Sequence, residues 1–213
     1  MIVLLRSREF WLDMVRLQVG LFLFGLAVAL MLEARIGLDP WSAFHDVLSA
    51  RSGLSFGQIS QLIGLLLIVI NRLVLAVRPG VATICNMLII GPWVDVLRPH
   101  VSFFDPAVGL PGTVQFLGGI LVLGVATAVY IGADLGAGPR DGLTMGLSRR
   151  IKKSLRASRV GAEVTVLIAA ALLGGSIGLG TLLFALLMGP TMQASLRIFA
   201  VPSDPSPRLR TKG

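Results

Sequence analysis

The stretch Gly136-Ala137-Gly138-Pro139-Arg140-Asp141-Gly142 abruptly ends a long apolar segment, and a weaker copy of it occurs earlier as Gly37-Leu38-Asp39-Pro40-Trp41-Ser42-Ala43. The copies are 99 residues apart, and the same offset pairs glycines and alanines of the apolar segments that precede them. One residue is then lost, and an offset of 98 continues the match as far as Pro190, which pairs with Pro92. The chain therefore contains an internal duplication, and a repeat of this kind determines the architecture.

Composition places the chain among membrane proteins. Of its 213 residues, 54% are hydrophobic and only 14% are charged, which is more apolar than a soluble core of this size requires. The net charge of +8 could suit nucleic acid, but the basic residues lie mostly in short segments between apolar runs. The single cysteine, Cys85, excludes an internal disulfide and a multi-cysteine metal site. We therefore expect an all-α membrane protein that binds no metal, no other cofactor and no nucleic acid.

The apolar runs predict six membrane-spanning helices, three in each copy, at residues 17–32, 58–70, 81–97, 114–133, 160–173 and 179–199. After the first span of each copy, glycine and proline break the chain, and a short helix is expected at 41–50 and at 143–153. Each short helix is either interfacial or a re-entrant half-helix. The expected segments are a cytoplasmic N-terminal segment 1–16, repeat one 17–97, an external linker 98–112, repeat two 113–199 and a disordered cytoplasmic tail 200–213.

The basic residues predict the orientation of these spans. With the N-terminus in the cytoplasm, 16 of the 19 basic residues fall on the inside, and only Arg35, Arg51 and Arg98 fall outside. Because each copy has an odd number of spans, the two copies must be inserted in opposite senses. We therefore expect inverted-topology repeats in a bacterial inner membrane, the plasma membrane of the cell, with both termini in the cytoplasm.

Several motifs also occur together along the chain. They are Gly-x-x-Pro-Trp after the first span, residues 90–95, residues 136–142, Arg159 with Glu163, and the glycine-rich residues 173–181. In combination they resemble the YczE/YitT-type family of small bacterial integral membrane proteins. That resemblance covers residues 17–199. It implies a build similar to that of small transporters and a grouping with drug exporters whose substrates are poorly defined.

The two Gly-Pro turns are the expected substrate site, because half-helix N-termini near the membrane midplane can bind anions. In the functional interpretation, Arg140 and the helix near Leu143 hold a substrate anion, while Asp141 and Asp39 bind a proton. In the structural interpretation, Arg140 pairs with Glu163 or Asp141 to bury the turn, and Asp39 is only a helix cap. The candidate substrate-binding residues are Asp39, Trp41, Gly138, Arg140 and Asp141.

The other candidates form a charge network and a set of turns. Asp95, Arg159 and Glu163 are the expected network, with Asp95 either in the cavity beside Asn86 or at the outer interface. His45 is either a proton relay or a solvated residue of an interfacial helix. The expected structural turn residues are Gly37, Pro40, Gly91, Pro92, Gly136, Pro139, Gly180, Gly189 and Pro190.

No motif supports an enzyme, because the sequence has no Walker loop, no Gly-x-Ser-x-Gly elbow and no histidine-rich metal constellation. We therefore predict a secondary transporter or exporter of a small molecule, with the lipid bilayer and this substrate as its partners. A homodimer fits, since six short helices enclose little volume. The alternative is a non-transporting scaffold or regulatory subunit that binds the helices of a partner. Only a transporter needs its turns wetted alternately from the two sides.

Overall fold

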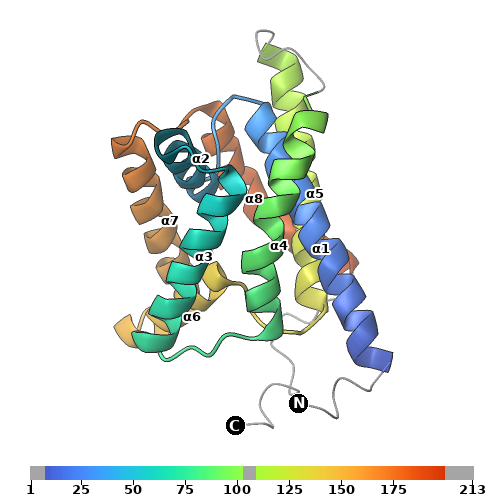
Figure 1. Ribbon diagram of the computed structural model, residues 1–213, viewed down its shortest axis with the longest axis vertical. Helices are drawn as coiled ribbons and strands as arrows, with labels where there is room; N and C mark the ends of the chain where they lie inside the picture. The colour runs from blue at the N-terminus through green and yellow to red at the C-terminus, as the bar shows by residue number, and fades with distance from the viewer. Residues whose placement is uncertain (1–7, 103–108, 200–213) are drawn as a thin grey trace.

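The computed structural model describes residues 8–102 and 109–199, and this part of the chain is helical without any strand (Figure 1). The expected N-terminal segment, linker and tail fall wholly or partly outside these residues. The helices are α1 (Arg8–Glu33), α2 (Pro40–Ser52), α3 (Phe56–Leu73), α4 (Val81–Leu97), the 3-10 helix η2 (Arg98–His100), α5 (Gly109–Gly132), α6 (Pro139–Ile151), α7 (Leu155–Leu172) and α8 (Leu179–Ile198).

Five of the described helices are long and apolar enough to cross a membrane, namely α1, α3, α4 continued through η2, α5 and α8. The expected sixth span, α7, is 18 residues long, as α3 is, but it is not among the helices that are apolar enough to cross a membrane. It carries Arg156, Arg159 and Glu163, which lower its hydropathy. The chain is therefore a multi-pass membrane protein with five candidate spans in its described part.

The two short helices begin at their prolines. The Asp39 carboxylate caps α2 by accepting a hydrogen bond of 3.2 Å from the Ser42 backbone N–H, and Pro40 takes the first helical position. In the second half, α6 starts at Pro139 and not near Leu143 as expected, because proline is already preorganised for that position.

Two glycines make the sharp turns before these short helices possible. Gly37 and Gly136 have φ angles of 110° and 118°, which only glycine adopts without strain. Each turn therefore needs glycine at this position.

The other expected Gly-Pro turns are continuous helix. Gly91 and Pro92 lie inside α4, while Gly189 and Pro190 lie inside α8. Gly180 belongs to the first turn of α8. A membrane helix can retain an internal proline because neighbouring groups satisfy the freed backbone carbonyl. These positions therefore do not interrupt the chain as the first turns do.

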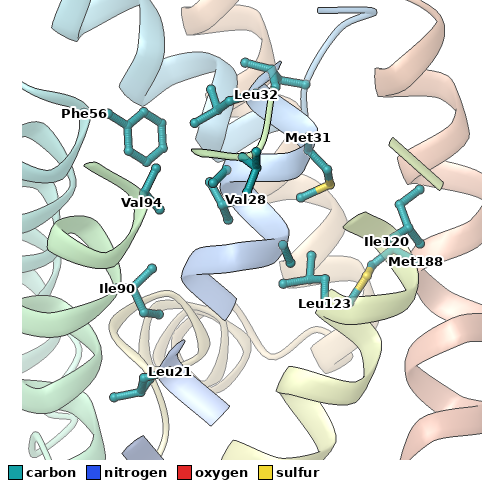
Figure 2. Packing of buried hydrophobic residues seen from close by; sticks show 14 of the residues in the cluster. Leu21, Val28, Met31, Leu32, Phe56, Ile90, Val94, Ile120, Leu123 and Met188 are labelled. Atoms are coloured by element: carbon teal, nitrogen blue, oxygen red, sulfur yellow. The ribbon is translucent and has the colours of Figure 1, made fainter. Parts of the chain in front are cut away.

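The core lies between α1, α4, α5 and α8 (Figure 2). α1 packs along α5, and each of these two helices packs in turn along the last helix of its own half. Small residues bring α1 and α5 close, since a β-carbon at Gly20 would lie 2.7 Å from the Tyr130 Cβ. The buried side chains labelled in Figure 2 are Leu21, Val28, Met31, Leu32, Phe56, Ile90, Val94, Ile120, Leu123 and Met188.

Four of the hydrogen bonds between the two halves form two matched pairs at the offsets of 98 and 99. In each pair, a residue at the start of the last helix of one half donates to the glycine-containing turn of the other half. The pairs are Ala82 N to Leu135 O (3.0 Å) with Gly180 N to Ile36 O (2.7 Å), and Thr83 Oγ1 to Ala137 O (2.6 Å) with Thr181 Oγ1 to Leu38 O (2.7 Å). Each turn is therefore held in place by the opposite half.

Candidate substrate-binding site

A cavity of about 200 Å³ lies between the two halves, and both glycine-proline turns line it. The N-termini of α2 and α6 reach it from opposite halves, with α2 in the upper and α6 in the lower part of Figure 1. The lining includes all the residues that the sequence predicted for substrate binding, which are Asp39, Trp41, Gly138, Arg140 and Asp141. The turns and their chemistry therefore meet in one place.

Arg140 is one of two arginines that line this cavity, the other being Arg159. The guanidinium carbon of Arg140 lies 5.0 Å from the centre of the Trp41 ring, a cation–π arrangement that orients the charge. Among the residues that the structure describes, the guanidinium forms no hydrogen bond and no ion pair. The expected structural pairing of Arg140 with Glu163 or Asp141 is not present as a hydrogen bond or ion pair, although both carboxylates lie close enough to act on its charge.

The Asp141 carboxylate belongs to a short hydrogen-bonded chain. It accepts a hydrogen bond of 2.7 Å from the Tyr130 hydroxyl, which itself accepts one of 3.1 Å from the Gly138 N–H. Tyr130 is buried in the last turns of α5 and lines the cavity. Sequence reasoning missed it, although it is the chain's one tyrosine and stands just before the second turn.

The remaining acidic groups of the cavity are also engaged. Glu163 accepts a hydrogen bond of 3.1 Å from Arg159 one turn earlier on α7, and both side chains line the cavity. Asp39 is buried and occupied as the cap of α2. Two of the three residues of the expected charge network thus lie at the site.

His45 is a buried member of the cavity lining and not a solvated residue of an interfacial helix. Its side chain is only 2% exposed, and it lies edge-on between Trp41 and Phe56. Neither ring nitrogen has a hydrogen-bond partner in the described part of the protein. The short helix α2, which carries His45, is not among the candidate spanning helices. Burial lowers the pKa of His45 well below its ordinary value, and the nearby charge of Arg140 lowers it further by a smaller amount. The imidazole is therefore neutral at pH 7.

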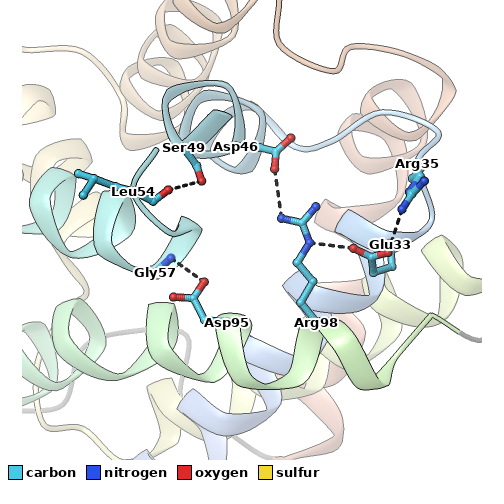
Figure 3. A network of polar contacts seen from close by, with 8 residues as sticks. All are labelled: Glu33, Arg35, Asp46, Ser49, Leu54, Gly57, Asp95 and Arg98. Carbon is cyan, nitrogen blue, oxygen red and sulfur yellow. Dashed lines mark hydrogen bonds and ion pairs between the residues drawn. The ribbon is translucent and has the colours of Figure 1, made fainter. Parts of the chain in front are cut away.

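Asp95, the third residue of the expected network, is not among the residues that line the cavity and lies beside Gly57 (Figure 3). Its carboxylate accepts hydrogen bonds from the Ser55 hydroxyl at 2.5 Å and the Gly57 N–H at 3.0 Å, at the N-terminus of α3. An anion at this place complements the helix dipole. Asp95 therefore anchors α4 to α3.

A second group of charges joins α1, α2 and η2 at the same end of the bundle (Figure 3). The Arg98 guanidinium forms ion pairs with Glu33, at 2.7 Å from Nε to Oε1, and with Asp46, at 3.5 Å from Nη1 to Oδ1. Arg35 Nη2 lies 3.6 Å from Glu33 Oε2. Sequence reasoning did not predict this group. The signal was available in Glu33 and Arg35, which flank the end of the first helix.

Comparison with known proteins finds a matching family and several relatives, one of them described as a membrane protein. A model described as "Family of unknown function (DUF6198)" matches residues 12–197. The chain is 36% identical over 181 residues to the "Uncharacterized membrane protein YczE" of Bacillus subtilis (strain 168), covering 83% of this chain and 82% of that protein. It is 32% identical over 185 residues to an "Uncharacterized protein" of Haemophilus influenzae (strain ATCC 51907 / DSM 11121 / KW20 / Rd), covering 85% and 82% respectively. No solved structure matches.

Proposed function

The chain belongs to the DUF6198 family, which confirms the resemblance to YczE-type membrane proteins, and within this family we propose that it is a secondary transporter or exporter of a small molecule. The observation that carries the proposal is the unpaired Arg140 guanidinium in a cavity that both turns line. Ionisable groups inside a membrane protein are expensive and usually mark a substrate or ion pathway. The substrate site is then formed by the two Gly-Pro turns.

We further propose that the halves are inverted-topology repeats, with α7 as the sixth span. The matched hydrogen bonds between the halves support this arrangement. So does the packing of the short helices, since α2 contacts α7 of the other half and α6 contacts α3. The distribution of basic residues supports a proposed orientation with both termini in the cytoplasm of a bacterium and the protein in its inner membrane. The proposed partners are the bilayer, the substrate and a second copy of the chain, with no cofactor and no catalytic step.

The test is thiol labelling from each side of the membrane, with the substitutions Asp39→Cys and Gly138→Cys introduced singly in a Cys85→Ala background. A transporter must wet both turns, so both positions should react with a membrane-impermeant maleimide, either from opposite faces or from both in exchange. Ser52→Cys, at an exposed site, is the control that should always react, and Ala29→Cys, at a fully buried site, should never react.

If neither turn position reacts in a folded protein, the proposal of a transporter is overturned. The turns would then be packed structure, and the chain would act as a scaffold or regulatory subunit for partner helices.

A further inference from the structure

The charged groups that line the cavity nearly balance one another. The described lining contains three carboxylates, from Asp39, Asp141 and Glu163, and two guanidiniums, from Arg140 and Arg159. These side chains leave one negative charge over. The first turns of α2 and α6 also line the cavity, and the N-terminus of a helix carries roughly half a positive charge. The two N-termini together offset the remaining negative charge, so the cavity is close to neutral as a whole.

The balance also holds group by group. Asp39 is the cap of α2 and Asp141 lies in the first turn of α6, so each helix N-terminus has its own anion. Glu163 is paired with Arg159 on α7. The charge of Arg140 is felt by all three carboxylates, which lie close to it. A ligand with a net charge of either sign would therefore lose its hydration in the cavity without gaining a free counter-charge.

Polar side chains of the lining nevertheless lack hydrogen-bond partners in the part of the chain that the structure describes. The Arg140 guanidinium and the Asn86 amide form no hydrogen bond there, and Asn86 Nδ2 would lie 3.3 Å from a β-carbon at Gly138. Both ring nitrogens of His45 are buried and unpaired. Unsatisfied buried polar atoms are rare in folded proteins and call for an explanation. Hydrogen-bonding groups of a ligand would satisfy them.

The unpaired groups indicate which ligand groups they can bind. A guanidinium has only N–H donors, so a carbonyl oxygen can accept from Arg140 without bringing a charge. The neutral imidazole of His45 has one donor and one acceptor, and a hydroxyl group can satisfy either. His45 belongs to α2 and Arg140 to α6, so a ligand that meets both bridges the two halves.

The rest of the cavity limits the body of the ligand. Its walls include Phe24, Val28, Leu123, Met188 and Met192, which are apolar. The cavity volume of about 200 Å³ is smaller than the roughly 300–1,000 Å³ of pockets that hold drug-sized ligands. A compact apolar body fits these walls.

We propose that the cavity binds a small molecule without net charge, which carries a carbonyl group and a hydroxyl group on a compact apolar body. The carbonyl oxygen accepts hydrogen bonds from Arg140 and Asn86, and the hydroxyl group lies at His45. This inference rests on the proposed function, since it names the cargo of the same site. Carboxylates, phosphates and organic amines are poor ligands, because each brings a charge that the balanced cavity does not compensate.

The experiment is isothermal titration calorimetry of the full chain in lipid nanodiscs, with empty nanodiscs as the blank. The probes are 4-hydroxybenzamide, 4-hydroxybenzoate and 4-hydroxybenzamidine, which share one shape but are neutral, anionic and cationic at neutral pH. We expect the amide to bind at least about tenfold more tightly than either charged probe, since an uncompensated charge is costly to desolvate. Equal binding of the three, tighter binding of a charged probe, or no binding of the amide at millimolar concentration would overturn the inference.

Charge variants test the balance directly. Arg140→Gln removes a positive charge and should shift the preference about tenfold toward the amidine, whereas Asp141→Asn removes a negative charge and should shift it about tenfold toward the acid. Arg149→Gln, at the exposed end of α6, should leave the preference unchanged. Either cavity variant suffices if the other fails to fold. An unchanged preference in a folded cavity variant would contradict the charge balance.

The position of the hydroxyl group has its own test. Benzamide, which lacks this group, should bind about fivefold more weakly than 4-hydroxybenzamide, the effect of one hydrogen bond. His45→Phe should remove the difference, because phenylalanine has no ring nitrogen to satisfy. A difference that persists in folded His45→Phe would contradict the contact with His45.

Thiol labelling of the two turns separates this inference from the proposed transport. Preferred binding of the amide by a protein whose turn positions never react would leave the neutral site standing and remove the transporter. Reactive turns together with a preference for a charged probe would do the reverse.

Discussion

The helix pair α3 and α4 of the first half corresponds to the pair α7 and α8 of the second half. The two pairs differ in how closely their helices pack. The first, which we call the α3–α4 seam, is closed: a β-carbon at Gly91 would lie 2.6 Å from the Gly57 carbonyl oxygen, and one at Gly64 would lie 2.8 Å from the Met87 side chain. In the second half, α7 makes no comparable contact with α8, and a side chain at Gly189 would meet open space.

The sequence explains this difference. Gly57 and Gly64 correspond to Arg156 and Glu163 on α7, so the small residues that let α3 approach α4 are replaced by long charged ones. Small residues allow close packing of membrane helices, whereas charged residues turn toward water-filled cavities. The duplicated turns have thus stayed alike while the helices beside them have diverged. In the proposed transporter, we therefore expect α7 to move relative to α8 during transport and α3 to stay packed against α4.

The largest expected effect comes from breaking the closed seam. Gly91→Leu would drive a side chain into the α3 backbone, and overpacking of this kind costs about 1–3 kcal/mol and occasionally more. Gly189→Leu, the matched substitution in the second half, should leave the unfolding temperature nearly unchanged because the space around it is open. Thermal unfolding in detergent, followed by size-exclusion chromatography, measures both. Similar losses in the two variants would show that α7 packs on α8 in the membrane.

A smaller effect should reveal what the halves still share. Thr83→Val and Thr181→Val each remove one hydroxyl that donates to the opposite turn, at 2.6 Å and 2.7 Å. Each hydroxyl also accepts a hydrogen bond from the glycine N–H three residues earlier, at 2.9 Å and 3.2 Å. Loss of one hydrogen bond costs about 1 kcal/mol, so both variants should lower the free energy of unfolding equally, by about 2 kcal/mol. Thr83→Ser and Thr181→Ser keep the hydroxyl and serve as controls. A clear inequality between the valine variants would mean that one turn carries more of the stability than the other.

Local rules account for what the sequence predicted correctly. The cap at Asp39, the start of α2 beside Pro40 and the glycine turns at Gly37 and Gly136 each depend on a few neighbouring residues. The duplication also placed both turns in one cavity before any contact was known. The same local rules misled at Gly91 and Pro92, because tertiary packing kept α4 continuous there.

The side-chain partners could not be predicted from the sequence. The Arg159–Glu163 pair is the exception, since the two residues stand four apart on one helix face, but the hydrogen bond from Tyr130 to Asp141 does not follow from spacing alone. Asp95 also lies outside the expected network. Its partners Ser55 and Gly57 come beside it only when α3 and α4 pack together, which the sequence does not show. His45 looked solvated because its helix is short and polar, but α2 is covered by other helices.

The smallest expected effect concerns two exposed arginines that tie each short helix to the other half. Arg51 donates two hydrogen bonds to the Leu173 carbonyl, at 2.8 Å and 3.1 Å, whereas its counterpart Arg150 donates one of 3.3 Å to the Val74 carbonyl. Exposed contacts of this type contribute about 0.2–1 kcal/mol, so Arg51→Ala should lower the unfolding temperature slightly and Arg150→Ala less. Because Leu173 is the C-cap of α7, weakening the Arg51 contact should also raise hydrogen exchange in α7. An equal rise of hydrogen exchange in α3 after Arg150→Ala would show that α3 and α7 are equally mobile. That result would contradict the expectation that α7 moves while α3 stays packed.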